Sequence, residues 1–204
     1  MRKFISGLIL GAGASQRFGE PKQLLPFADT TLIGWVVRQA QRTLHLDEVI
    51  VVLGRSADEI RERVDFGDAK VVENLVFTEG CASSYRAGLA AVDSHADAIM
   101  IILGDQPGIT PEIIDSLAED WRRSNAPIAI CTYEGRNGRR KGHPMIFARS
   151  LFDELEVLHG DKAAWKLVDA NASAVLEVDL ALPFPEDINT RADFERIASA
   201  ESTD

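Results

Sequence analysis

Short apolar runs alternate along the chain with stretches in which apolar residues recur at the spacing of a helix with one buried face. The runs predict buried β-strands at residues 5–10, 48–53, 69–72, 98–103, 127–132, 144–147 and 174–178. The periodic stretches predict helices at residues 32–44, 56–64, 83–92, 110–123, 149–155, 161–169 and 190–200. This alternation of strands and helices predicts a three-layer α/β/α sandwich.

The predicted sheet is mostly parallel and contains one antiparallel hairpin. Runs such as 48–53, EVIVVL, are continuously apolar after the first residue, which is typical of parallel strands covered by helices on both faces. Thr30 or Thr31, and later Thr110, precede predicted helices as capping residues. Residues 134–141 carry an Asn-Gly pair and predict a loop between antiparallel strands, because such pairs favour hairpin turns. The fold class is therefore α/β with a Rossmann-like sheet.

The length of 204 residues suits a single domain spanning residues 1–204, since no linker or repeat divides the chain. No apolar run approaches the roughly 20 residues needed to cross a bilayer. The basic N-terminus continues directly into a glycine-rich stretch without a cleavage site, so we expect a cytoplasmic location. Cys81 and Cys131 lack the paired spacing of metal or redox motifs and are predicted to be reduced thiols.

The net charge of −10 and the pI of about 4.9 argue against binding to nucleic acid or to an anionic membrane. In so acidic a chain, local groups of cations stand out. One group is Arg17 with Lys22, and the other consists of Arg136, Arg139, Arg140 and Lys141. Both are candidate anion sites, although the second group also fits a solvated loop.

The first predicted strand leads into a glycine-rich turn that carries the first group of cations. Gly11 and Gly13 permit backbone conformations and close approaches that a Cβ would block, so successive N–H groups can face phosphate oxygens. Arg17 adds a planar guanidinium and Lys22 a mobile ammonium. The turn therefore predicts a polyphosphate site. A strand-to-helix turn with merely solvated cations is the alternative.

Two familiar glycine motifs do not fit this turn. The dinucleotide pattern G-x-G-x-x-G needs a glycine where Gln16 stands, and the strand that ends at Gly54 lacks the acidic residue that would bind a ribose. The P-loop pattern fails because Phe18 stands where its next glycine is required. Neither motif therefore explains the turn.

Two aspartates are candidate magnesium ligands. Asp105 follows the strand at 98–103, and Asp187 precedes the last predicted helix. Magnesium that accompanies a nucleoside triphosphate takes one or two carboxylates together with phosphate oxygens and water. Both aspartates also fit simple turns. His143, between a glycine and a proline and close to cations, is either a substrate contact or a turn histidine. No G-x-S-x-G or H-E-x-x-H motif is present, which weakens hydrolase and zinc-enzyme interpretations.

Several segments resemble a known family, in the family's order. Residues 10–19, LGAGASQRFG, followed by Lys22, resemble the L-x-x-G-x-S-x-R-M-G-x-x-K signature of the MobA-like nucleotidyltransferases, and most closely the molybdenum cofactor cytidylyltransferases. The segment EGCASSYRAGL at residues 79–89 resembles the family's G-M-x-x-S-x-R-x-G-L. The other matches are Gly104-Asp105-Gln106-Pro107, Gly142-His143-Pro144, Gly160-Asp161-Lys162 and Asp187-Ile188-Asn189-Thr190.

The resemblance implies the fold of nucleotide-diphospho-sugar transferases and assigns roles to residues. The nucleotide-binding positions would be Leu10, Gly11, Ala12, Gly13, Ser15, Arg17, Lys22, Ser83, Gly104, Asp105 and Gln106. Arg17, Lys22 and Asp105 would act in catalysis, and Asp105 and Asp187 would hold Mg²⁺. Arg140 and His143 would contact the acceptor.

The resemblance also implies an activity, the transfer of CMP from CTP to molybdopterin with release of pyrophosphate. Ala12 and Gln106 match the members that use CTP rather than GTP, and a molybdenum hydroxylase would be the client enzyme. Trp165 stands where an arginine is common, which leaves open another phosphorylated acceptor, such as a sugar phosphate or phospholactate. A nucleotide-binding oxidoreductase and a non-catalytic chaperone that delivers the cofactor also stay open at this point.

Overall fold

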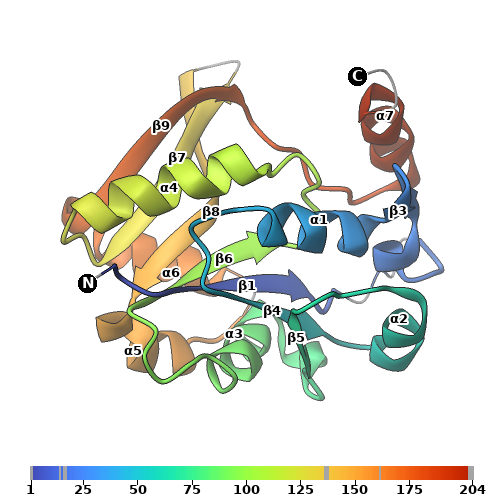
Figure 1. The fold of residues 1–204 in the computed structure, drawn as a ribbon, viewed down its shortest axis with the longest axis horizontal. Helices are drawn as coiled ribbons and strands as arrows, with labels where there is room; N and C mark the ends of the chain where they lie inside the picture. Colours follow the sequence, from blue (N-terminus) through green and yellow to red (C-terminus); the bar gives the residue numbers. More distant parts are fainter. Residues whose placement is uncertain (1, 14, 16–17, 136–137, 161, 202–204) are drawn as a thin grey trace.

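A seven-stranded sheet lies between two layers of helices (Figure 1). The computed structural model describes residues 2–13, 15, 18–135, 138–160 and 162–201. In sheet order the strands are β5 (Lys70–Glu73), β4 (Glu48–Leu53), β1 (Ile5–Gly11), β6 (Ala98–Leu103), β8 (Gly138–Ala148), β7 (Ile128–Gly135) and β9 (Val175–Pro183). Only β8 among these strands runs antiparallel to its neighbours. The predicted α/β sandwich with one antiparallel hairpin is confirmed.

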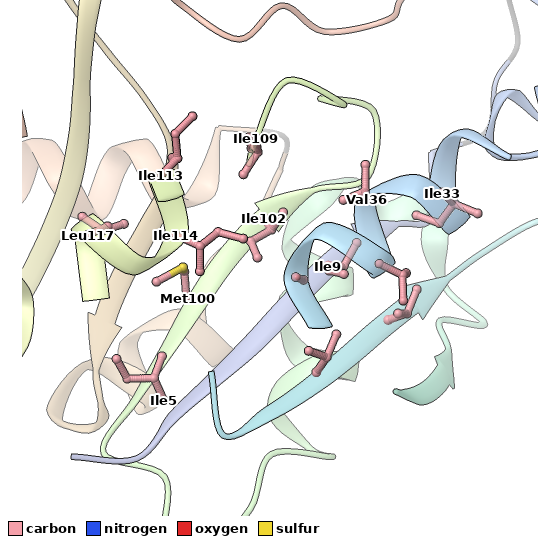
Figure 2. Packing of buried hydrophobic residues seen from close by; sticks show 14 of the residues in the cluster. Ile5, Ile9, Ile33, Val36, Met100, Ile102, Ile109, Ile113, Ile114 and Leu117 are labelled. Atoms are coloured by element: carbon pink, nitrogen blue, oxygen red, sulfur yellow. The ribbon is translucent and has the colours of Figure 1, made fainter. Parts of the chain in front are cut away.

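Each face of the sheet has its own apolar core because side chains alternate along a strand. From β1, Ile5 and Ile9 join one core, while Leu8 joins the other. The first core is closed by α1 (Leu32–Gln41), α2 (Ala57–Arg63) and α4 (Pro111–Arg123), and Figure 2 shows Ile33, Val36, Ile113 and Leu117 above the sheet. The second core is closed by α3 (Cys81–Leu89), α5 (Phe152–Glu156) and α6 (Ala163–Ala170).

Helices α1 and α3 differ from their predicted bounds. The Thr31 hydroxyl accepts a hydrogen bond from the Gly34 N–H, which confirms Thr31 as the cap of α1. This helix ends at Gln41, so including Leu44 was wrong, and the Leu44 side chain is 78% exposed. Helix α3 begins at Cys81 rather than Ser83, because Gly80 has a positive φ of 92° that starts the helix earlier.

The predicted loop at 134–141 was also wrong in extent. Strand β7 continues to Gly135 and β8 begins at Gly138, so the described part of this segment is mostly paired strand. The polar composition is explained by ion pairs on the sheet surface. Arg139 pairs with Asp179, and the Lys141 ammonium lies 2.6 Å from the Glu177 carboxylate, both on β9. Arg136 lies outside the described residues.

Smaller elements surround the end of β1. A two-stranded ribbon of β2 (Pro26–Phe27) and β3 (Thr30–Thr31) precedes α1, and α7 (Arg191–Glu201) follows the last loop. Phe27, Leu32 and Ile188 form a third cluster with side chains of α7 against it. The 3-10 helices are Lys22–Leu24, Phe77–Glu79, Arg149–Leu151 and Ala172–Ala174.

Over the described ranges, no helix is long and apolar enough to cross a membrane. Cys81 and Cys131 are not joined in a disulfide, as expected for two thiols without paired spacing.

Candidate functional site

A cleft of about 320 Å³ lies where β1 and β6 end. These two strands are parallel neighbours, so their carboxyl ends meet on one side of the sheet, where open α/β sheets bind ligands (Figure 1). The cleft is lined by Leu10, Gly11, Ala12, Gly13, Lys22, Gln23, Phe77, Gly80, Cys81, Ser84, Leu103, Gly104, Asp105 and Asp187. The structure therefore brings together the predicted glycine turn, the predicted lysine and both predicted carboxylates.

Gln23 holds the glycine turn in shape. Its Nε2 donates to the carbonyl oxygens of Gly11 and Gly13, at 2.6 and 3.0 Å. The Ser15 hydroxyl lies 3.2 Å from the Gln23 Oε1 and accepts a hydrogen bond from the Lys22 N–H at 3.0 Å. Ser15, predicted to bind nucleotide, is thus a residue that fixes the turn. Gln23 was missed because only the folded turn shows what its amide reaches. Arg17 lies outside the described residues.

Lys22 spans the cleft from the glycine turn to the end of β6. Its Nζ donates to the Asp105 Oδ2 at 2.5 Å and to the Ile188 carbonyl at 3.0 Å. The side chains of Lys22 and Asp105 are only 13% and 24% exposed. The ammonium and the carboxylate are therefore held at one point inside the cleft, beside the third charged group, Asp187.

Gln106 positions Asp187 beside Asp105. The Gln106 Nε2 donates to the Asp187 Oδ1 at 2.6 Å and to the Pro185 carbonyl at 3.2 Å. The Ile188 N–H donates to the Asp105 carbonyl at 2.9 Å, which ties the two loops together. Burial and the neighbouring Asp105 charge raise the pKa of Asp187. Gln106 itself is buried and is absent from the cleft lining, so it lies behind the carboxylates in this structure, and its predicted nucleotide contact stays a prediction.

The two carboxylates fit a divalent cation that arrives with its phosphate ligands. Among the described residues, no three or more His, Cys, Asp or Glu side chains are grouped as a metal site. Magnesium commonly uses only one or two carboxylates and completes its shell with phosphate oxygens and water. A cation between Asp105 and Asp187 would also relieve the repulsion that raises the pKa of Asp187.

A buried polar network forms the wall at the start of α3. The Asn74 Nδ2 donates to the hydroxyls of Ser83 and Ser84, at 2.7 and 3.1 Å, and its backbone N–H donates to the Leu53 carbonyl. Ser83 is buried and its hydroxyl also donates to the Gly80 carbonyl. Ser84 lines the cleft, whereas Ser83, the predicted nucleotide-binding residue, lies behind it in this network, and its nucleotide contact stays a prediction.

A bulge in β8 places His143 at the other side of the site. Ile130 pairs with Met145 and Cys131 with Gly142, which leaves His143 and Pro144 as extra residues on β8. His143 is 8% exposed, and its Nε2 has no hydrogen-bond partner within the described part of the chain. Burial lowers the pKa of His143 to about 4, although Asp105 opposes this shift. The imidazole is therefore neutral at pH 7.

Strand alternation separates Arg140 from its cationic neighbours. Arg139 and Lys141 pair with acidic residues of β9, whereas Arg140 points to the opposite face and its guanidinium stacks 3.5 Å from the Phe184 ring centre. Arg140 also lowers the pKa of Asp187, in opposition to burial. A Cβ at Gly142 would lie 2.6 Å from the Phe184 ring, so this close approach requires glycine. Phe184 was missed because no motif includes it.

Comparisons with known proteins identify the family of the chain. The MobA-like NTP transferase domain family matches residues 7–175. The chain is 32% identical over 152 residues to nicotine blue oxidoreductase of Paenarthrobacter nicotinovorans, which covers 72% of each protein. It is 22% identical to a probable molybdenum cofactor guanylyltransferase of Thermococcus sibiricus, over 95% of this chain and 97% of that protein. The crystal structure of the manganese complex of Rv0371C from Mycobacterium tuberculosis superposes with a TM-score of 0.82 at 34% identity, covering 98% and 100% of the two chains.

Proposed function

The chain belongs to the MobA-like NTP transferase family, and from this premise we propose that it transfers the cytidylyl group of CTP to molybdopterin. One observation supports a nucleotidyl transfer above all others. The glycine turn, Lys22 and the carboxylates of Asp105 and Asp187 converge in one cleft at the ends of β1 and β6.

The proposed reaction is a direct displacement at the α-phosphorus of CTP. A phosphate oxygen of the acceptor forms a bond to this phosphorus, the bond to the bridging oxygen breaks, and pyrophosphate leaves with the electron pair. The Lys22 ammonium and the N–H groups of the glycine turn lower the energy of the transition state by neutralising charge on the leaving group. The cleft walls hold the two reactants in line.

Mg²⁺ is the proposed metal. Asp105 and Asp187 would hold it, and it would supply positive charge to the reacting phosphates. Gln106 would keep the Asp187 carboxylate in place for this metal through the 2.6 Å hydrogen bond from its Nε2. Lys22 and Asp105 neutralise each other before the triphosphate enters.

The base preference rests on Ala12. This residue is buried, lines the cleft, and has its methyl group where glycine would leave more room for a purine. We therefore propose CTP over GTP, even though the Thermococcus relative is named a guanylyltransferase. The difference between the two bases would come from one methyl group and from the shape of the α3 wall.

The acceptor would bind on the β8 side of the cleft. Arg140, stacked on Phe184, offers a cation to a phosphate, and the unpartnered Nε2 of His143 offers a neutral hydrogen-bonding atom. Together these groups suit a phosphorylated aromatic heterocycle, of which molybdopterin is the proposed example. The product would then pass to a molybdenum hydroxylase client.

A substrate panel tests this proposal. Purified protein is incubated with each of the four nucleoside triphosphates and Mg²⁺, with and without molybdopterin, and pyrophosphate release is measured. We expect release to require both CTP and molybdopterin. Release with a sugar phosphate instead would assign a different acceptor. Hydride-cofactor consumption without pyrophosphate would instead favour the oxidoreductase activity for which the Paenarthrobacter relative is named.

A further inference from the structure

The ion pair between Lys22 and Asp105 occupies a carboxylate that the proposed metal needs. The Lys22 Nζ lies 2.5 Å from the Asp105 Oδ2 and 3.0 Å from the Ile188 carbonyl oxygen. Over the part of the chain that the structure describes, Lys22 is the only cation that an ion pair or a hydrogen bond joins to the Asp105 carboxylate. Because both side chains are mostly shielded from water, this pair is screened less than an ion pair on the surface.

Asp187, the second proposed metal ligand, is held by a neutral donor. The Gln106 Nε2 donates to its Oδ1 at 2.6 Å, and within the described ranges no ion pair neutralises its charge. A divalent cation shared by the two carboxylates would need oxygens of Asp105, where the Lys22 ammonium already lies. Two cations on one carboxylate repel each other strongly in a site that is mostly shielded from water. Lys22 and a divalent cation therefore compete for Asp105.

The structure holds the backbone of Lys22 and leaves its side chain able to move. The Lys22 N–H donates to the Ser15 hydroxyl at 3.0 Å, and its carbonyl accepts from the Leu25 N–H at 3.1 Å. The side chain lines the cleft, and its four-carbon stem is flexible. The ammonium can therefore exchange Asp105 for another anion in the cleft without any change of the backbone. A triphosphate, which carries several negative charges, can draw the ammonium away from a single carboxylate.

We propose that Lys22 blocks metal binding at Asp105 and Asp187 until a triphosphate draws its ammonium away. This inference rests on the proposed nucleotidyl transfer, because that reaction brings a triphosphate into the cleft. The free protein then binds a divalent cation weakly. The triphosphate and the cation each strengthen the binding of the other, because both oppose the contact between Lys22 and Asp105.

Lys22→Met tests the inference, since methionine has a similar length and no charge. Mn²⁺ is titrated into the full chain without nucleotide, and free Mn²⁺ is measured by electron paramagnetic resonance. We expect Lys22→Met to bind Mn²⁺ about tenfold or more tightly than the wild type, whose apparent affinity is reduced by the fraction of molecules in which Lys22 holds Asp105. The double variant Lys22→Met, Asp105→Asn should lose this gain. Lys22→Gln provides the same comparison if Lys22→Met does not fold.

Arg140→Met is the matched control for the loss of a positive charge. The charge of Arg140 also acts on Asp187, but among the described residues no ion pair or hydrogen bond joins its guanidinium to either carboxylate. We expect Arg140→Met to raise the affinity for Mn²⁺ about twofold at most, because its charge acts at a longer range. An equal gain in Arg140→Met and Lys22→Met would overturn the inference, since the loss of any nearby cation would then be sufficient.

Equal Mn²⁺ affinity in the wild type and in Lys22→Met would also overturn the inference, as would a gain that persists in the double variant. Failure of the proposed transfer gives a different pattern. A gain in Lys22→Met, lost in the double variant, together with a wild type that releases no pyrophosphate from CTP with any acceptor, would refute the transfer and leave the competition for Asp105 intact. Pyrophosphate release by the wild type with no gain in Lys22→Met would refute the competition and leave the transfer intact.

Discussion

The two sides of the cleft, which we propose to bind the nucleotide and the acceptor, are built in different ways. In the glycine turn of the nucleotide side, the contacts join residues that are close in sequence: Gln23 holds Gly11 across a separation of 12 residues. On the acceptor side, Gln106 reaches Asp187 across 81 residues, and Arg140 of β8 stacks on Phe184 beyond β9. The shape of the glycine turn is therefore specified by a local segment, whereas the acceptor side depends on how distant segments meet.

This difference predicts that triphosphate binding and acceptor binding can be changed independently by substitution. Substitutions in the glycine turn should change the affinity for the triphosphate, and substitutions around β8 should change the affinity for the acceptor. Asp105 belongs to both sides, since its carboxylate contacts Lys22 of the turn and its backbone carbonyl accepts from Ile188. The comparison can therefore be tested by one substitution that should abolish most of the turnover and by others that should change the binding of only one of the two substrates.

The largest effect is expected for Asp105→Asn. The amide keeps the size of the side chain but removes the anion that a metal and Lys22 both need. Turnover, measured as pyrophosphate release, should fall at least about a hundredfold, or roughly 2.7 kcal/mol of transition-state stabilisation. Asp29→Asn, which removes an exposed partner of Arg38, is the control. A folded Asp105→Asn protein with wild-type turnover would show that Asp105 shapes the turn and does not take part in catalysis.

Lys22→Ala should weaken the binding of CTP and leave the binding of the acceptor unchanged. The ammonium makes one charge-assisted contact to the triphosphate in the proposed complex, so its loss should cost about 1.5 to 3 kcal/mol of CTP binding. Calorimetric titration with CTP measures this, and Lys70→Ala, which removes a surface partner of Glu48, provides the comparison. An unchanged CTP affinity at physiological salt would place Lys22 outside the phosphate site, as a partner of Asp105 only.

The sequence was sufficient for the elements whose signals are local. Short, mostly apolar runs predicted β1, β4 and β6, and Asp105 was singled out because a polar turn follows the most apolar of these strands. The cap of α1 was narrowed to Thr30 or Thr31 because a capping hydrogen bond is local, and in the structure Thr31 accepts it from Gly34, three residues on. These features depend on neighbours in sequence, so composition and periodicity reveal them.

What the sequence could not predict depends on distant partners. The polar segment 138–141 is a strand because β7 pairs with it and acidic residues of β9 neutralise its cations. Phe184 was not predicted because its ring contacts Gly142, about forty residues earlier in the chain, only after β9 has paired with β7. Gln106, part of a recognised motif, turned out to support Asp187 because the loop before α7 folds against it. Leu44 matched the helical period, but α1 had already ended at Gln41.

Ala12→Gly should change base selection within the nucleotide side. Removing one methyl group from a buried wall is expected to shift the ratio of kcat/KM for CTP over GTP by about tenfold towards GTP. Both values are measured on the same variant, so any loss of folded protein cancels in the ratio. A ratio that stays at the wild-type value would mean that Ala12 packs only against Gly54 and its neighbours and that the base is selected elsewhere.

The smallest effect is expected for Phe184→Ala, and it is confined to the acceptor side. Phe184 contributes a ring face to the Arg140 guanidinium and an edge contact to Tyr133, so its loss leaves Arg140 less well oriented without removing the charge. A cation–π contact at a partly exposed site contributes about 0.5 to 1 kcal/mol, so the KM for the acceptor should rise about two- to fivefold.

The KM for CTP is the internal control in this experiment, because Phe184 does not line the nucleotide cleft. Leu182→Ala, an exposed apolar residue of β9, is the matched variant and should leave both constants unchanged. If Phe184→Ala raised the KM for CTP and for the acceptor equally, the ring would be supporting the whole strand-end framework through Tyr133. The two sides of the cleft would then be coupled through β7, because Tyr133 also donates to the His143 carbonyl at 2.5 Å.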